Sequence, residues 1–317
     1  SNAKWDDWCG VPWPSLAKAS KYEPVTGSYC ASNAWDALDT GGSATRWSLG
    51  NLREFRKSGQ RPVFFIRLYH RFSPGWYGEG KVLGMKGFGI LVQAVKHNAN
   101  IPCDGKNWFA SEMQWVGWGP SAKTQVYKGM CIHGHYYSYM PYSQDVQPML
   151  GEELRLGGTR FSAYANQRVW VHLDEWYCYE VGLYMNTPGE ADGEGRFWEN
   201  GVLTTHIKNM RYADTMEAFK VYAQIQYYRT QHDNATTPVA RFIDNVVVAN
   251  RYIGPIKFSD KQVAHFVDKG IVVHTGDEHL TERMRKARER KPKSVVPSIG
   301  GKSPVGLDHR AATPGGK

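Results

Sequence analysis

An almost strict alternation of apolar and polar residues runs Phe219-Lys220-Val221-Tyr222-Ala223-Gln224-Ile225-Gln226-Tyr227. Because successive side chains of a β-strand point to opposite faces, this pattern predicts a strand with one face in an apolar core. The other face carries a polar row that comprises Lys220, Tyr222, Gln224, Gln226 and Tyr228. Such half-buried strands are typical of antiparallel sheets.

The same period occurs in a second run, from Val63 to Phe72. It puts one set of residues on an apolar-leaning face, namely Ile66, Leu68, His70 and Phe72, and a second set on the opposite face, namely Arg67, Tyr69 and Arg71. The arginines and the tyrosine could bind a ligand. This run therefore predicts a second half-buried strand with Arg67 and Tyr69 as candidate binding residues.

Further strands and turns follow toward the C-terminus. Residues 168–184 and 243–249 hold apolar runs of strand length, and Asn200-Gly201 is a strong signal for a β-hairpin. Long helical periodicity is nearly absent before residue 277, which disfavours alternating strands and helices. Many short strands separated by Gly and Pro turns indicate an all-β sandwich or barrel.

We expect one main domain with two flanking segments. Residues 1–61 are aromatic, Gly-rich and weakly periodic, which predicts an irregular N-terminal layer that belongs to the main domain. Residues 62–276 would form the β-domain itself. Residues 277–317 would form a basic tail, with a short charged helix at 278–291 and a Pro/Gly-rich end.

The composition excludes several classes of protein. The chain has 317 residues, of which 41% are hydrophobic and 22% charged, so a large core is expected and global disorder is excluded. The five cysteines contain no Cys-x-x-Cys pair, which argues against a zinc ribbon. No apolar run approaches the roughly 18 residues that a spanning helix needs, so we expect no membrane span.

The net charge of +9 is concentrated at the C-terminal end. Residues 277–317 hold ten Lys and Arg residues and five Asp and Glu residues. Basic and acidic residues alternate in the helical part, and no recognised nucleic-acid module accompanies them. We therefore expect a solvated tail and no nucleic-acid partner.

The densest group of chemically active residues is Cys131-Ile132-His133-Gly134-His135-Tyr136-Tyr137-Ser138-Tyr139. In an extended segment, His133, His135, Tyr137 and Tyr139 share one face. A His-x-His pair can bind a metal, but the acidic third ligand expected shortly after His135 is missing, so we expect no catalytic metal.

Acidic residues in a turn-rich loop offer a different chemistry. Glu190, Asp192 and Glu194 could suggest a laminarinase-like glycoside hydrolase, but they lack the alternating carboxylates on one strand that such a sandwich-fold enzyme needs. Asp192 and Asp244 could bind a structural calcium ion, although an acid in a loop is more often a turn former. No cofactor is expected.

Five segments between about residues 62 and 256 together resemble the jelly-roll polysaccharide lyases, namely the alginate lyases of family fourteen and the related glucuronan lyases. The first is Gly80-Lys81-Val82-Leu83-Gly84-Met85-Lys86-Gly87, which is similar to the family's Gly-Lys-Leu-Pro-Gly-Leu run. Ser121-Ala122-Lys123 resembles its Ser-Ala-Arg, and His135-x-Tyr137 falls where the family has Tyr-x-Tyr. The other two pieces, 186–201 and 244–255, resemble framework segments of these domains.

The resemblance implies a concanavalin A-like jelly-roll β-sandwich and cleavage of an acidic, uronate-containing polysaccharide by β-elimination in a concave groove. It implies that Lys81 and Lys123 neutralise the uronate carboxylate and that Ser121 helps to hold it. Tyr137 and His135 would share the roles of base and acid. Lys123 in place of Arg and His135 in place of Tyr are departures that leave the polysaccharide open.

The expected substrate-binding set also includes residues from the polar strand faces, namely Arg67, Tyr69, Tyr139, Tyr222, Gln224 and Gln226. The alternative function is a non-catalytic, lectin-like carbohydrate-binding protein that uses the same face. Its candidate stacking residues are Trp115, Trp118, Tyr136, Tyr139, Tyr222 and Tyr228. Ser1-Asn2-Ala3 resembles a cloning remnant, and together with the resemblance it leads us to expect a secreted or extracytoplasmic protein.

Overall fold

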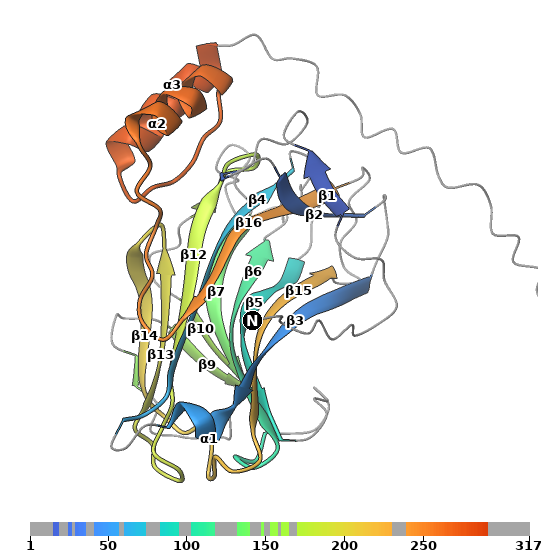
Figure 1. The fold of residues 1–317 in the computed structure, drawn as a ribbon, viewed down its shortest axis with the longest axis vertical. Helices are drawn as coiled ribbons and strands as arrows, with labels where there is room; N and C mark the ends of the chain where they lie inside the picture. Colours follow the sequence, from blue (N-terminus) through green and yellow to red (C-terminus); the bar gives the residue numbers. More distant parts are fainter. Residues whose placement is uncertain are drawn as a thin grey trace, which may run out of the picture.

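The computed structural model describes residues 15–18, 25–26, 29–35, 41–56, 60–73, 83–94, 103–117, 132–139, 147–148, 153–157, 160–164, 170–229 and 239–290. These residues form two antiparallel β-sheets that face each other, together with three helices (Figure 1). The expected all-β jelly-roll β-sandwich is confirmed.

Sheet 1 has the strand order β1-β2-β16-β4-β12-β13-β14-β8. Its strands are β1 (Ser15–Lys18), β2 (Tyr29–Trp35), β16 (Val239–Ala249), β4 (Val63–Phe72), β12 (Tyr177–Tyr184), β13 (Gly193–Glu199), β14 (Val202–Met210) and β8 (Gln147–Pro148). The turn between β13 and β14 is the predicted Asn200-Gly201 hairpin. Both residues have positive φ, 51° and 83°, as the tight turn requires.

Sheet 2 has the strand order β3-β15-β5-β6-β7-β10-β9, and β11 also pairs with β7. Its strands are β3 (Gly41–Asn51), β15 (Lys220–Arg229), β5 (Leu83–Gln93), β6 (Trp108–Gly117), β7 (Ile132–Tyr139), β10 (Arg160–Tyr164), β9 (Glu153–Gly157) and β11 (Trp170–Val171). The two alternating runs, 63–72 and 219–227, are therefore in different sheets: β4 is in sheet 1 and β15 is in sheet 2.

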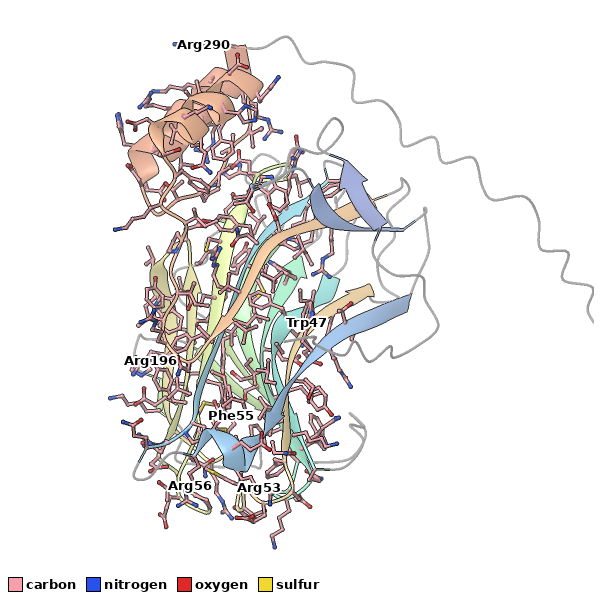
Figure 2. All side chains as sticks on the ribbon, viewed as in Figure 1. Trp47, Arg53, Phe55, Arg56, Arg196 and Arg290 are labelled. Atoms are coloured by element: carbon pink, nitrogen blue, oxygen red, sulfur yellow. The ribbon has the colours of Figure 1, made fainter. Side chains whose placement is uncertain are left out.

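The main hydrophobic core fills the space between the sheets. Sheet 1 contributes Ile66, Leu68 and Phe72, and sheet 2 contributes Val221, Ala223 and Ile225, all buried. The predicted inward faces of both runs are thus confirmed. Trp47 on β3 packs against this core, and Trp47 and Arg196, labelled in Figure 2, mark the two sheets.

The N-terminal segment differs from its expectation. In place of an irregular layer, its described residues form β1, β2 and β3, followed by α1 (Leu52–Phe55). β3 pairs along its whole length with β15. The strand was missed because Gly41, Gly42, Ser43 and Ser48 dilute the apolar alternation, and cross-strand pairing overrides the low intrinsic propensity.

Two helices, α2 (Asp260–Lys269) and α3 (Glu278–Arg290), lie at one end of the sandwich (Figure 1). α3 was predicted and is confirmed, whereas α2 was not predicted. The expectation of a solvated tail is wrong for α3, because Thr281 and Met284 are buried and Arg285 forms an ion pair with Glu175. Both pack on the outer face of sheet 1 through a second core that includes Tyr69, Phe266 and Met284. Within the described ranges, none of the helices is long and apolar enough to cross a membrane.

Candidate functional site

The outer face of sheet 1 is closed by the C-terminal segment. Tyr69 is fully buried beneath this segment, and its hydroxyl accepts a hydrogen bond from the backbone N–H of Ile256. Arg67 is also buried, with its guanidinium over the Tyr69 ring. The side chains of Arg67 and Tyr69 therefore lie on the opposite side of the sandwich from Gln224 and Gln226, and the four cannot line one groove.

The outer face of sheet 2 carries the polar side chains that the sequence predicted. Strand register places Arg46 of β3 opposite Gln224 of β15, Gln224 opposite Gly89 of β5, Gly89 opposite Glu112 of β6, and Glu112 opposite Tyr137 of β7. Residues opposite each other in antiparallel strands share a face. One continuous row therefore crosses five strands and ends at the candidate catalytic tyrosine.

The described side chains of this region form a hydrogen-bonded group that we call the buried polar network (Arg46, Gln224, Gln226 and Glu112). Arg46 Nε donates to Gln224 Oε1 at 3.1 Å, and Gln226 Nε2 donates to Glu112 Oε1 at 2.7 Å. Gln224 Nε2 donates to the same carboxylate oxygen. Exposure is 8% for Arg46, 1% for Gln224 and 2% for Glu112. A polar group this deeply buried is held in one geometry by its hydrogen bonds.

Gly89 leaves room for the contact between Gln224 and Glu112. Gln224 and Glu112 are on strands that flank β5, so their contact passes over the Gly89 position. A Cβ built on Gly89 would lie 2.1 Å from the Ser111 carbonyl oxygen and 2.6 Å from Glu112 Cα. Without a side chain at this position, the amide of Gln224 can reach across one strand to the carboxylate.

Two bulges meet at Gly87, next to the network. On one side, the pairing of β5 with β15 shifts between Ile225 and Tyr228, and on the other its pairing with β6 shifts between Lys86 and Phe88. Bulges change the face on which the following residues lie. Phe88 is in the core, but Lys86 pairs with Gln114 and therefore takes an outer-face position.

The candidate catalytic residues on β7 fit into these rows by register. Tyr137 is opposite Glu112, and His135 is opposite Gln114, which in turn is opposite Lys86. Tyr139 is opposite Ala110. For His135, Tyr137 and Tyr139 the structure describes the strand position. Lys81, Lys123 and Ser121 lie outside the described residues.

The candidate binding residues of β15 are already engaged with protein groups. Gln224 and Gln226 hold Glu112 through their amides, and Tyr222 packs in a small cluster with Leu91 and Trp108. These contacts give the two glutamines a role in positioning Glu112, whatever else they bind.

Two of the proposed stacking residues point the other way. Trp115 is fully buried between the sheets, where its ring stacks on His70 at 4.0 Å. Tyr136 is also fully buried, and its hydroxyl is hydrogen-bonded to Ser111 and Tyr212. The expectation that Trp115 and Tyr136 stack on sugar is wrong, because the strand alternation turns both into the core.

The loop acids have structural contacts. Asp192 accepts hydrogen bonds from the Thr187 backbone and hydroxyl, and Asp244 accepts one from the Thr26 N–H. Glu194 was expected in a turn but lies in β13, where it pairs with Arg196 and His206. Among the described side chains, no three His, Cys, Asp or Glu residues gather closely enough to hold a metal ion.

Sequence reasoning missed Arg46 and Glu112. The sequence could have placed Glu112 on a strand face, because residues 108–115 have strand periodicity. One face would carry Trp108, Ala110, Glu112 and Gln114, and the other Phe109, Ser111, Met113 and Trp115. No comparable signal existed for Arg46, since β3 itself was not predicted.

Solved structures of lyases resemble this chain in part. The alginate lyase Aly36B has a TM-score of 0.49 and 13% identity, covering 76% of this chain and 87% of that chain. An alginate lyase from a Chlorella virus has a TM-score of 0.48 and 12% identity, covering 75% and 90%. The endo-β-1,4-glucuronan lyase of the fungus Trichoderma reesei has a TM-score of 0.41 and 14% identity, covering 79% and 96%.

No protein-family model matches the sequence, and no curated protein sequence matches it either. At such low identity to the solved structures, function has to be inferred from the residues of this chain.

Proposed function

We propose that this protein is a polysaccharide lyase that cleaves a uronate-containing polysaccharide by β-elimination on the outer face of sheet 2. The observation that carries the proposal is the register of Tyr137 with Glu112 and of His135 with Gln114. Tyr137 and His135, which we propose as the proton-transfer residues, thus hold strand positions opposite two polar residues of β6. A fixed position of this kind is what a catalytic side chain needs.

The proposed reaction is balanced without a co-reactant. A base takes the proton from C5 of the uronate, and the electron pair of that C–H bond forms the C4=C5 double bond. The bond between C4 and the glycosidic oxygen breaks, and an acid protonates the leaving oxygen. Tyr137 and His135 share these two roles, because a histidine titrates near neutral pH and a tyrosine can donate or accept a proton through its hydroxyl.

The uronate carboxylate must be neutralised for C5 to lose its proton. We assign this role to Lys81 and Lys123, with Ser121 as a further hydrogen-bond donor, on the sequence resemblance of their segments to lyase motifs. Lys81 precedes the first residue of β5, Leu83, by two positions in the sequence. Leu83 pairs with Gly117, which pairs with Ile132 at the start of the strand that carries His135.

The proposed substrate is an acidic polysaccharide, and the proposed location of the protein is secreted or extracytoplasmic, where such polymers occur. We propose no metal or other cofactor for the reaction, because β-elimination with protein acid and base groups needs none.

The decisive experiment follows the ultraviolet absorbance of the unsaturated uronate product. The protein is incubated with alginate, glucuronan, pectate and non-sulfated glycosaminoglycans, beside Tyr137→Phe and Tyr252→Phe. Tyr252 is a matched control because it is exposed and lies on the sheet 1 side, beside Trp198. We expect absorbance to rise with one class of polymer, Tyr137→Phe to abolish the rise, and Tyr252→Phe to retain it.

A flat trace with every polymer would remove the lyase proposal. If a retardation gel then still showed polysaccharide binding that Tyr137→Phe left intact, the lectin-like alternative would replace it. Equal activity of Tyr137→Phe and the native protein would instead show that the phenol takes no part in proton transfer.

A further inference from the structure

Three buried polar side chains, which we call the interior polar cluster, meet in the core between the sheets. Trp115 is on β6 of sheet 2, and Tyr179 and Glu199 are on β12 and β13 of sheet 1. Tyr179 and Glu199 are register partners and therefore share a face, and the Trp115 ring meets the Tyr179 ring edge-on at 5.7 Å. Exposure is 0% for Trp115 and Tyr179 and 4% for Glu199.

The polar atoms of this cluster make no direct hydrogen bond. Within the part of the chain that the structure describes, Trp115 Nε1, the Tyr179 hydroxyl and Glu199 Oε1 are all buried without a hydrogen-bond partner. Burying a polar group without a hydrogen bond is costly, and such groups are rare in native proteins. Three of them side by side therefore indicate a ligand that bonds to all three.

The three groups lie close enough to influence one another. Burial, and next the charge of Glu199, raise the pKa of the Tyr179 hydroxyl well above its usual value, and the Trp115 N–H opposes this rise. Burial also raises the pKa of Glu199 to about 8, so its carboxyl group is protonated at neutral pH. All three side chains are then uncharged, which favours a neutral ligand over an ion.

The space around the cluster suits only a small ligand. The Phe72 ring packs against Trp115, with ring centroids 5.5 Å apart, and the Phe197 ring stacks on Tyr179 at 6.0 Å. These apolar neighbours belong to the main core. A close-packed core of this kind leaves few spaces larger than a water molecule.

We propose that the interior polar cluster is a binding site for a water molecule that bridges the two sheets. A buried water typically makes about three hydrogen bonds, and the cluster offers three partners. The water accepts a hydrogen bond from Trp115 Nε1, because an indole nitrogen can only donate. It donates one to Glu199 Oε1, and the Tyr179 hydroxyl takes either role.

The bridge supports the candidate site from the core side. Trp115 follows Gln114, the register partner of His135, and itself pairs with Gly134 of β7. The water therefore ties β6 to sheet 1 at the level of the proposed proton-transfer residue His135. The inference itself concerns the core and does not depend on the proposed reaction.

The test is a set of high-resolution crystal structures of the full-length chain. Glu199→Gln keeps an acceptor oxygen, and Glu199→Leu removes every polar atom of the side chain. The matched control is Tyr177→Phe, because Tyr177 stacks on Tyr179 but its hydroxyl accepts a direct hydrogen bond from the His172 N–H. We expect a water within hydrogen-bond distance of Trp115 Nε1 and the Tyr179 hydroxyl in the native protein, Glu199→Gln and Tyr177→Phe, and its loss in Glu199→Leu.

A measurement on the native protein in solution keeps the inference testable if a variant fails to fold. The indole N–H signal of Trp115, assigned through its loss in Trp115→Phe, should show a nuclear Overhauser effect from water with the sign of a bound molecule. The effect should disappear in Glu199→Leu. An effect that persists there would come from proton exchange of the Tyr179 hydroxyl and would count against the water.

A Tyr179 hydroxyl bonded directly to Glu199, with no solvent between them, would overturn the inference. A water that stays in place in Glu199→Leu would also overturn it, by removing Glu199 from the site. The lyase proposal would stand in both cases, since it is tested by the release of unsaturated uronate.

Discussion

Arg241 on β16 of sheet 1 reaches across the sandwich and donates a hydrogen bond from Nη1 to the backbone carbonyl of Gln226 on β15 of sheet 2, at 3.1 Å. The bulge in β15 falls at this residue, since Gln226 and Tyr227 together stand opposite Gly87 of β5. Gln226 in turn holds Glu112 through its side chain. One buried arginine thereby connects the far sheet to the buried polar network.

We predict that Arg241→Met lowers the free energy of unfolding by about 2–5 kcal/mol, because it removes a donor from two buried acceptors. The second acceptor is His70 Nε2, at 3.0 Å from Arg241 Nε. Burial and the charge of Arg241 hold the pKa of His70 well below its usual value, so its neutral ring can accept this bond. Denaturant unfolding measures the change.

The control is Arg196→Met, at a partly exposed ion pair with Glu194, which should lower the free energy of unfolding by no more than about 1 kcal/mol. Equal costs in the two variants would contradict the prediction.

Gly89→Ala should destabilise the protein by about 1–3 kcal/mol or more, because the new methyl group would overlap the backbone of β6. It should also weaken polysaccharide binding, since it displaces the contact between Gln224 and Glu112. Gly189→Ala is the control: nothing lies within 4 Å of its Cβ, and only the positive φ of 84° opposes the change. We expect this control to keep binding. Denaturant unfolding and polysaccharide binding are measured for both variants. Normal polysaccharide binding by Gly89→Ala would show that binding does not depend on the space left by Gly89.

The stability of the protein should fall as pH rises through the window set by Glu199. Burial raises the pKa of Glu199 from 4.5 to about 8. Between these values the unfolded chain releases the proton that the folded chain retains, so the contribution of Glu199 to stability is fully present below pH 4.5 and is lost as pH approaches 8. Glu199→Gln should abolish this slope, and the control Glu190→Gln should retain it. Unfolding curves across the window test this, and an unchanged slope in Glu199→Gln would assign it to another group.

A second pH dependence, of opposite sign, should affect the packing of α3. Although burial favours the neutral acid, the hydrogen bonds and charges of His274 and Arg285 lower the pKa of Glu175 from 4.5 to about 2. This contribution, on the order of 3 kcal/mol, is present above 4.5 and is lost as pH falls toward 2. The protection factors of the α3 amides, in which exchange is corrected for its intrinsic pH dependence, should fall over that range in the native protein, and they should be low and independent of pH in Glu175→Gln. Slow exchange in the variant would show that apolar packing alone holds the helix.

Much of the sandwich could be predicted from the sequence because alternation is a local property. The runs at 63–72 and 219–227 each determined which of their side chains enter the core, and Asn200-Gly201 determined a hairpin, since only neighbouring residues are involved. β3 and α2 could not be predicted in the same way. Their stability comes from pairing with β15 and from packing on sheet 1, both with residues distant in sequence.

The candidate site could likewise be predicted from the sequence only in part. His135 and Tyr137 share a strand face by sequence alone, but only the tertiary structure brings Glu112 opposite Tyr137 and Gln224 within reach of Glu112. It also decided that Arg67 and Tyr69, on a polar face by sequence, are covered by the C-terminal segment. A sequence period states which residues share a face. Strand order, bulges and packing determine what that face meets, because they depend on contacts between residues far apart in the chain.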